Sequence, residues 1–397
     1  MILTNTHAHQ KHRPPSHTEY YEYRQMPNLK NEFPLDPKLC YLNHAAVAPW
    51  PSRTTQAISS FALENNTHGA TNYLKWLKVE TTLRQQLKTL LNAVSTDEIA
   101  LQKNTSEGLS AIAYGIDWKP GDSIVITDQE FPSNRIVWES LANKGVRVIT
   151  ATLDYNQPEV SIINACDAST RLVSISSVQY GTGIRVDLKK IGAHCNQQGI
   201  LFCIDAIQSL GAIPMDVQDI GCDFVVADAH KWMLGPEGIA VFYIKTSTLN
   251  QLTLNQFGWH MIENPGNYDT LDWDIASNAK RFECGSPNMI GIHGFSASLS
   301  LLLEIGLSNI ETMLNKKIDL LLTLLQDKPG ITILSPTDPT QRAGIVTFQS
   351  DKIESQTLYQ QLMRQNVICA YRGGGVRLSP HFYTPDDVLI NAVKLIP

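Results

Sequence analysis

The chain has 397 residues, with 32 Lys and Arg against 38 Asp and Glu, so its formal charge at pH 7 is −6. Hydrophobic residues make up 43% of the chain and charged residues 18%, which excludes an intrinsically disordered protein and predicts a large buried core. The acidic balance indicates no cluster of Lys and Arg of the kind that binds nucleic acid or anionic lipid. We therefore expect a small-molecule ligand, no nucleic acid and no membrane.

Cysteine usage and the beginning of the chain bear on the compartment. The seven cysteines form no CxxC pair and no dense framework, so neither a zinc site nor a set of disulfides is indicated. The first residues contain no apolar core of a secretory signal, and we expect a cytoplasmic protein. A polar tail with Pro14 and Pro15 is more typical of a flexible arm than of a metal site, although it carries four histidines (His7, His9, His12 and His17). We therefore expect no metal.

The apolar pattern predicts helices over residues 52–66 and 71–92, and then an alternation of short strands and helices up to residue 244. Six strands are nearly all apolar, as strands buried on both faces must be. They are predicted over residues 123–127, 147–151, 172–176, 200–204, 224–227 and 239–244. Helices over 134–144 and 188–198 each end near a glycine. This alternation predicts an α/β fold with a mostly parallel sheet.

The pattern loosens after residue 244 into a long irregular connection. Helices are then predicted over 288–305, 310–327 and 354–365, and strands over 344–348 and 367–371. A last helix has Thr384 as its N-cap, Pro385 at its first position and an acidic first turn. We expect a flexible arm over 1–35, a large domain over 36–255, and a connecting segment with a small α+β domain over 256–397.

Two charged residues follow predicted buried strands. Asp205 follows the strand over 200–204, and Lys231 follows the apolar run that ends the strand over 224–227. Ligands of parallel sheets bind at the carboxyl ends of the strands, and a buried lysine has the lowered pKa that favours Schiff-base formation. Taken singly, Asp205 also fits a helix N-cap and Lys231 a structural ion pair. Together they match pyridoxal phosphate, which needs an acid at its ring nitrogen and a lysine at its aldehyde.

An anion site is also predicted, because Asn104, Thr105 and Ser106 begin a helical stretch whose free N–H groups suit a phosphate. An ordinary helix cap has the same appearance. No Walker loop and no GxGxxG motif follows a strand, so nucleotide binding is not indicated.

Several segments resemble the class V aminotransferase family of pyridoxal-phosphate enzymes, which includes cysteine desulfurases, selenocysteine lyases, kynureninase and isopenicillin N epimerase. The segments run in the family's order and span nearly the whole chain beyond residue 35. They are YLNHAAVAP (41–49), NTSEGLS (104–110), EFPSN (130–134), SSVQYGTG (176–183), DAIQSLG (205–211), ADAHKWMLGPEGIAVFY (227–243), RFECGSPN (281–288) and RLSPHFYTPDD (377–387). The resemblance implies the type I fold of PLP-dependent transferases, with a mostly parallel seven-stranded sheet in the large domain and a smaller α+β C-terminal domain.

The resemblance also implies roles for individual residues. Lys231 is the Schiff-base lysine, and Asp205 pairs with the pyridine nitrogen. Gln208 faces the phenolic oxygen. Phe131 replaces the histidine that stacks on the ring in desulfurases. The remaining expected cofactor contacts are Thr105, Ser106, Ser177, Asp228 and His230, of which His230 is also placed beside the catalytic lysine.

The phosphate and the substrate complete this assignment. Asp228 stands where relatives often have a serine on the phosphate, and Ser286 is expected to reach the phosphate from a second subunit, which implies a homodimer. Arg377 matches the arginine that holds the substrate carboxylate, a role suited to its fork of N–H groups. Further candidates for the substrate pocket are Asn43, His44 and Gln179, followed by Tyr180 and Arg372.

The expected reaction begins with removal of the Cα proton of a small amino acid by Lys231 and continues as a lyase or an aminotransferase. A desulfurase needs a nucleophilic cysteine before Arg377, and only Cys369 lies there, at the end of a predicted strand. The short glycine stretch that follows argues against a standard desulfurase. Cysteine desulfurase, selenocysteine lyase and epimerase stay open as alternatives, and so does a catalytically silent PLP-binding relative.

Overall fold

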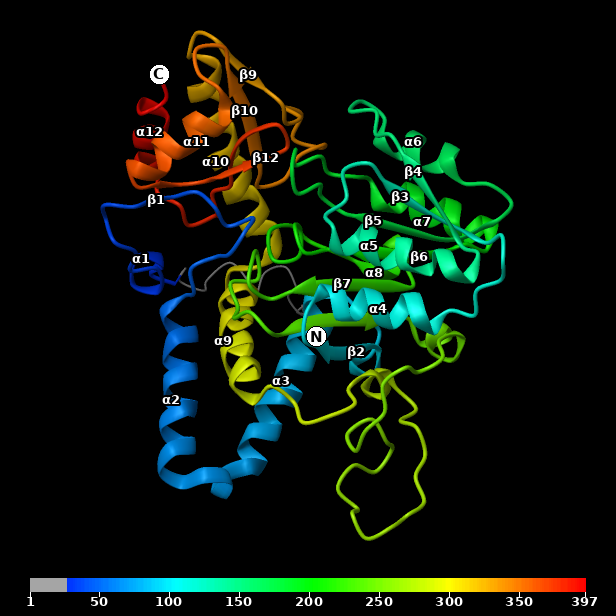
Figure 1. Ribbon diagram of the computed structural model, residues 1–397. Helices are drawn as coiled ribbons and strands as arrows, with labels where there is room; N and C mark the ends of the chain where they lie inside the picture. The colour runs from blue at the N-terminus through cyan, green and yellow to red at the C-terminus, as the bar shows by residue number, and fades with distance from the viewer. Residues whose placement is uncertain (1–26) are drawn as a thin grey trace, which may run out of the picture.

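The computed structural model describes residues 27–397, so the histidines of the N-terminal tail lie outside the described residues (Figure 1). Its centre is a seven-stranded sheet of order β2-β8-β7-β6-β5-β3-β4. The strands are β2 (Ile99–Gln102), β3 (Ser123–Thr127), β4 (Arg147–Ala151), β5 (Thr170–Ser176), β6 (Leu201–Asp205), β7 (Phe224–Asp228) and β8 (Ala240–Ile244). Strands β3 to β7 run parallel. Strand β8 pairs antiparallel with both β7 and β2, so it alone runs against the others. The predicted mostly parallel sheet is confirmed.

Alternate residues of the strands fill two cores, one on each face of the sheet. Val125 and Val173 belong to one core, whereas their neighbours Ile124 and Leu172 belong to the other. Burial on both faces explains why these strands are continuous apolar runs. The helices that cover the sheet are α4 (Thr105–Gly115), α5 (Ser133–Glu139), α6 (Pro158–Ala165), α7 (Leu188–Gln198) and α8 (Val217–Ile220).

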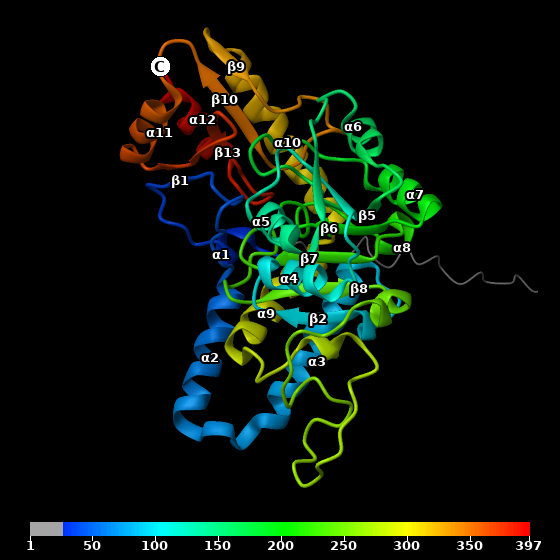
Figure 2. The same ribbon diagram turned by 45° about the vertical axis from the view of Figure 1, so that its right-hand side comes forward.

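Two long helices, α2 (Ser52–His68) and α3 (Tyr73–Leu91), form a hairpin that packs against α9 (Met289–Ile305). The predicted irregular connection is present between Gln251 and Ala279, where the structure has neither a helix nor a strand. It extends on the same side of the molecule as the tip of the α2–α3 hairpin (Figures 1 and 2).

The C-terminal part of the chain forms a four-stranded antiparallel sheet of order β12-β13-β10-β9. Its strands are β9 (Ile331–Ile333), β10 (Val346–Ser350), β12 (Ala370–Arg372) and β13 (Gly375–Leu378). The strands pack with α10 (Leu307–Gln326) and α11 (Ser355–Arg364), and α12 (Asp386–Lys394) packs against α10 and β1 (Cys40–Tyr41).

The strand predicted over 367–371 is divided. Its first part, β11 (Val367–Ile368), pairs with β1 (Cys40–Tyr41), and its second part is β12 of the antiparallel sheet. Cys369 lies at the break. The predicted cap of the last helix is wrong by one residue: Pro385 is the N-cap, and the Thr384 hydroxyl accepts a hydrogen bond from the His381 N–H instead.

The described part of the expected N-terminal arm is packed. Helix α1 (Leu29–Glu32) leads into Phe33, whose ring stacks on Tyr383 with 3.4 Å between centroids. Within residues 27–397, no single helix is long and apolar enough to span a membrane, and α9 and α10 meet that criterion only as a pair bent by 82°.

Candidate active site

A cavity of about 480 Å³ lies at the carboxyl ends of β6 and β7. This is within the range typical of small-molecule sites, and it lies where parallel sheets bind their ligands. Asp205 is the last residue of β6 and Asp228 the last of β7, so the sheet presents both carboxylates at one edge. The N-terminal segment, the large sheet and the small antiparallel sheet all contribute to the walls, which include Asn43, Thr105, Phe131, Tyr180, Gln208, His230, Lys231, Cys369, Arg372 and Arg377.

Lys231 lines the cavity with only 8% of its surface exposed. Burial lowers the pKa of its amine to about 8, and the positive charge of Arg377 acts in the same direction. The carboxylates Asp205 and Asp228 oppose that shift. The lysine is therefore ready to act as a nucleophile or base near neutral pH, as its sequence context predicts.

Asp205 is 1% exposed, and its Oδ1 accepts a hydrogen bond of 3.1 Å from the Ile207 N–H. Burial raises the pKa of its carboxyl to about 7, and the nearby Glu130 adds to this rise. A carboxylate held at a strand end in this way is stabilised by a cationic or N–H partner in the cavity.

Phe131 stands over the cavity with 40% of its surface exposed. Its ring centroid lies 5.6 Å from the Lys231 Nζ, and it meets Tyr180 edge-on at 5.2 Å. The exposed ring is therefore available to stack on a flat ligand beside Lys231.

The N-terminus of α4 borders the cavity. Asn104 caps the helix by accepting from the Glu107 N–H at 2.9 Å, and the Thr105 hydroxyl oxygen accepts from the Asp228 N–H at 3.2 Å. The Asp228 Oδ1 and the His230 Nδ1 are buried and have no hydrogen-bond partner among the described residues. Burial raises the pKa of Asp228 and lowers that of His230 to about 4. This end of the cavity thus holds polar atoms that require a ligand.

Arg377 lies across the cavity, buried on β13. Its guanidinium donates to the Tyr180 carbonyl at 2.6 Å and to the Asn43 Oδ1 at 3.4 Å, while its Nε has no partner among residues 27–397. Burial lowers its pKa to about 10, and the charge of Arg372 contributes. Two neutral acceptors orient this cation and leave its charge for an anionic ligand.

A model of the aminotransferase class-V family matches residues 40–380. The chain belongs to this family. A probable cysteine desulfurase of Methanothermobacter thermautotrophicus is 28% identical over 383 residues, which cover 91% of this chain and 94% of that protein. This chain is therefore a pyridoxal-phosphate enzyme of the lyase or transferase type, as the resemblance predicts.

Solved structures share the fold of this class V protein. A cysteine desulfurase of Thermococcus onnurineus NA1 superposes with a TM-score of 0.84 at 23% identity, covering 94% of this chain and 97% of that chain. The cystine C–S lyase C-DES, in complex with its product cysteine persulfide, gives the same TM-score and identity over 94% of this chain and 99% of that chain. The type I fold expected from the sequence is therefore confirmed.

The cavity of this class V enzyme fits pyridoxal phosphate. Lys231 suits the aldehyde, Asp205 the ring nitrogen, and Phe131 the ring face, while the free Nδ1 of His230 and the α4 terminus suit the phosphate. One feature departs from a simple anion site: the unpartnered carboxylate oxygen of Asp228 lines the same cavity and repels a phosphate unless it is protonated.

Five expected site residues do not line the cavity. His44 and Gln179 are fully buried; both ring nitrogens of His44 are bonded, to the Ser379 carbonyl and to the Tyr383 hydroxyl. The Ser177 hydroxyl contacts Ser209 at 2.6 Å. Ser286 lines a different hollow of about 300 Å³, between the β2–α4 connection and the beginning of α9. The hydroxyl of a fifth, Ser106, donates to Ser133, which does line the cavity.

A buried polar network behind the cavity was not predicted. Glu130 precedes Phe131 and accepts from the Ser176 N–H, the Ser176 hydroxyl and the Asn134 amide at 2.6–2.9 Å. It thereby holds the segment that presents Phe131. Glu130 lies in the EFPSN motif, so a buried acid next to the stacking aromatic was the available signal.

A second unpredicted network fixes the residue after Lys231. The Trp232 indole N–H donates to Gln208 Oε1 at 2.9 Å, and the Gln208 amide donates to the Ala45 carbonyl at 3.0 Å. His381 Nδ1 accepts from the Phe382 N–H, so its Nε2 donates to the Trp232 carbonyl at 3.2 Å. The N-terminal and C-terminal segments therefore both position the Lys231 backbone.

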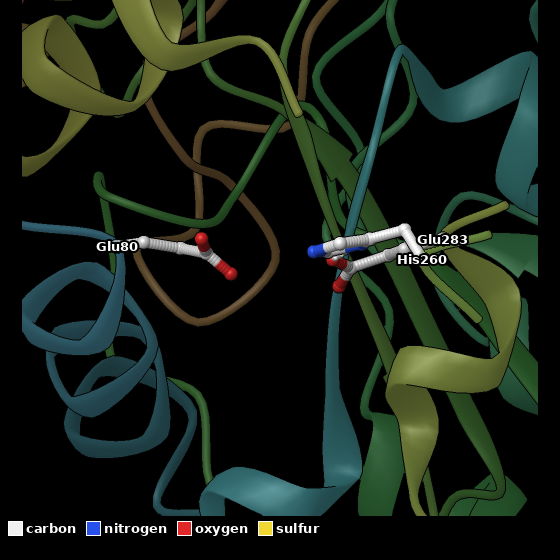
Figure 3. Close-up of side chains that lie close together, drawn as sticks. All are labelled: Glu80, His260 and Glu283. Atoms are coloured by element: carbon white, nitrogen blue, oxygen red, sulfur yellow. Dashed lines mark ion pairs between the residues drawn. The ribbon is translucent and has the colours of Figure 1, made fainter. Parts of the chain in front are cut away.

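Outside the cavity, Glu80, His260 and Glu283 come close enough to hold a metal ion (Figure 3). Arg84 already pairs with both glutamates, at 2.7 Å each, and the Leu101 N–H donates to Glu283 at 2.7 Å. Because the cluster contains its own cation, we interpret it as an ion-pair network that ties α3 to the segment before Ser286.

Proposed function

We propose that the protein is a carbon–sulfur lyase that acts on cysteine or its disulfide, cystine, by β-elimination. The observation that carries the proposal is the state of Cys369. It is the only cysteine lining the cavity among the described residues, but it is 2% exposed, and burial raises the pKa of its thiol to about 12. A thiol in that state is a poor persulfide carrier, because the thiolate is the nucleophile.

The chain's own groups would orient the substrate and transfer the proton in the elimination. Arg377 would hold the α-carboxylate, which fixes the orientation of the Cα–H bond toward Lys231. The neutral Lys231 amine would take the Cα proton, the Cβ–S bond would break, and its electron pair would leave with sulfur. Bound pyridoxal phosphate would supply the carbonyl that binds the amino group and the ring that delocalises charge at Cα. Asp205 would keep that ring protonated.

The two possible reactions differ in their products. Elimination consumes water, and it converts cysteine into pyruvate, ammonia and sulfide, or cystine into pyruvate, ammonia and cysteine persulfide. A desulfurase instead makes alanine and leaves the sulfur on an enzyme thiol. The second candidate deserves a test because Cys369 does line the cavity, and relatives named cysteine desulfurases are up to 32% identical.

The experiment is to assay pyruvate, alanine and sulfide with wild type, Cys369→Ala and the control Cys195→Ala. Cys195 is also buried with its thiol pKa raised, but it lies in α7 away from the cavity. We expect pyruvate from all three proteins at rates within about twofold, since a carrier thiol is not needed. Alanine from wild type together with loss of activity in Cys369→Ala alone would establish the desulfurase instead.

We further propose a homodimer in the cytoplasm. The support for a dimer is that Ser286, expected at the phosphate, lies outside the cavity of its own chain, so a second copy is needed to supply it. Light scattering of wild type and of Ser286→Ala, with the pyridoxal-phosphate affinity of each, tests this. A monomer that binds pyridoxal phosphate with full affinity would exclude the homodimer.

The support for the cytoplasm is that all seven cysteines are free thiols.

A further inference from the structure

A second arginine shares the cavity face of the β12–β13 hairpin. Arg372 pairs with Gly375 and Ala370 pairs with Arg377 in this antiparallel ladder. Residues 375 and 377 lie on the same side of β13, so Arg372 and Arg377 project from one face as diagonal neighbours. Both line the cavity, and the residue opposite Arg372 is a glycine, which adds no side chain to that face.

The hairpin tip is fixed in place. Gly373 and Gly374 form the turn with φ of +60° and +80°, a conformation that favours glycine. A Cβ on Gly373 would lie 2.4 Å from the Gly181 carbonyl oxygen, so the turn packs directly on the segment after Tyr180. Arg372 is therefore carried by a defined backbone, although its side chain is exposed.

The two guanidinium groups have no acidic partner. Within residues 27–397, neither Arg372 nor Arg377 forms an ion pair, and the one hydrogen bond from the Arg372 side chain goes to the carbonyl of its neighbour Tyr371. The carboxylates that line the cavity, Asp205 and Asp228, interact with Lys231 at its other end. One end of the cavity thus carries two like charges that an anionic ligand can balance.

We propose that Arg372 binds a second, distal carboxylate of the substrate, so that the enzyme selects amino acids with two carboxylates, and cystine over cysteine. This inference rests on the proposed carbon–sulfur lyase function. With Arg377 on the reacting α-carboxylate, Arg372 reaches the carboxylate at the far end of the same molecule. Cysteine has no group that reaches Arg372.

The spacing suits a disulfide-linked substrate. Diagonal neighbours on an antiparallel ladder are about 7–8 Å apart. The two α-carbons that a disulfide joins are about 5.5–6 Å apart, and each carries its carboxylate outward. The distance between the two carboxylates of cystine is therefore of the same size as that between the arginine positions.

The experiment compares cystine with S-methylthiocysteine, which has the same disulfide bond but no distal carboxylate. Pyruvate formation is measured for wild type, Arg372→Gln, Arg372→Lys and the control Arg364→Gln, an exposed arginine at the end of α11 that does not line the cavity. We expect Arg372→Gln to raise the KM for cystine about tenfold or more, with kcat and all S-methylthiocysteine parameters within about twofold. Arg372→Lys should retain part of the preference, since it keeps the charge.

The outcomes are distinguishable. Equal effects of Arg372→Gln on both substrates, or no effect on either, would overturn the role of Arg372 while leaving the lyase function intact. No pyruvate from either substrate with wild type would remove the proposed function itself. S-sulfocysteine, whose distal group is a sulfonate, should show the same increase in KM with Arg372→Gln as cystine, because Arg372 binds the negative charge.

Discussion

Replacing Arg84 with methionine should destabilise the protein more than any exposed charge change. Arg84 is buried and donates four hydrogen bonds of 2.7–2.8 Å, to Glu80, to both oxygens of Glu283 and to the Ile99 carbonyl. Its loss strands two buried carboxylates, for which a cost of about 3–5 kcal/mol is typical. Urea unfolding of the apoprotein, followed by tryptophan fluorescence, should show a midpoint lowered by about 1 M for a chain of this size.

The matched control is Arg135→Met, whose partner Glu139 forms an ion pair at the surface, with both side chains about half exposed. That change should cost less than about 0.5 kcal/mol. A cost within about 1 kcal/mol of the control at pH 7 would refute the view that this cluster is an ion-pair network completed by Arg84.

Two further predictions concern the cavity, and a third concerns the packing around Trp232. The rate at which pyridoxal phosphate develops its visible band on the apoprotein should rise with pH to a midpoint near 8, because the neutral Lys231 amine reacts and its pKa is lowered to about 8. A Lys231→Ala variant should develop no such band, and a midpoint above 10 would contradict the assignment. Asp228→Asn should bind pyridoxal phosphate more tightly at pH 8, measured by equilibrium dialysis, because it removes a carboxylate with an unpartnered oxygen from the phosphate end of the cavity. Since burial raises the pKa of the Asp228 carboxyl, this advantage should diminish as the pH falls, and equal affinities at pH 8 would place the phosphate elsewhere. Gly344→Ala should lower the unfolding free energy by about 1–3 kcal/mol, since its Cβ would lie 2.1 Å from the Trp232 ring, and unchanged stability would show that the indole moves freely.

The large sheet was predictable because burial on both faces leaves a strong sequence signal. Lys231 and Asp205 were recognisable for the same reason: charged residues directly after apolar strands stand out. Strand β2 was missed, since its four residues begin directly after a short 3-10 turn and carry little pattern of their own. The division of 367–372 into β11 and β12 was also invisible, because pairing partners far along the chain decide it.

The limits at the site follow from side-chain direction, which a motif does not specify. Ser177 and His44 lie in segments that resemble the family, but the polar atoms of both side chains already form hydrogen bonds inside the protein. Arg377 and Arg372 come together only through the register of a hairpin, and Glu130 acts through contacts with two other elements. Residue identity therefore indicated the chemistry, whereas tertiary packing decided which groups reach the cavity.

The junction between β1 and β11 bears on how the enzyme is made. His44 bonds to the carbonyl of Ser379, 335 residues later in the chain, and the cavity wall that holds Asn43 depends on that segment. During synthesis the large sheet can assemble while the ribosome is still working, but this wall has no partner until residues 367–379 emerge. A chain truncated before residue 366 would therefore retain most of its core and still lack a closed site for its substrate.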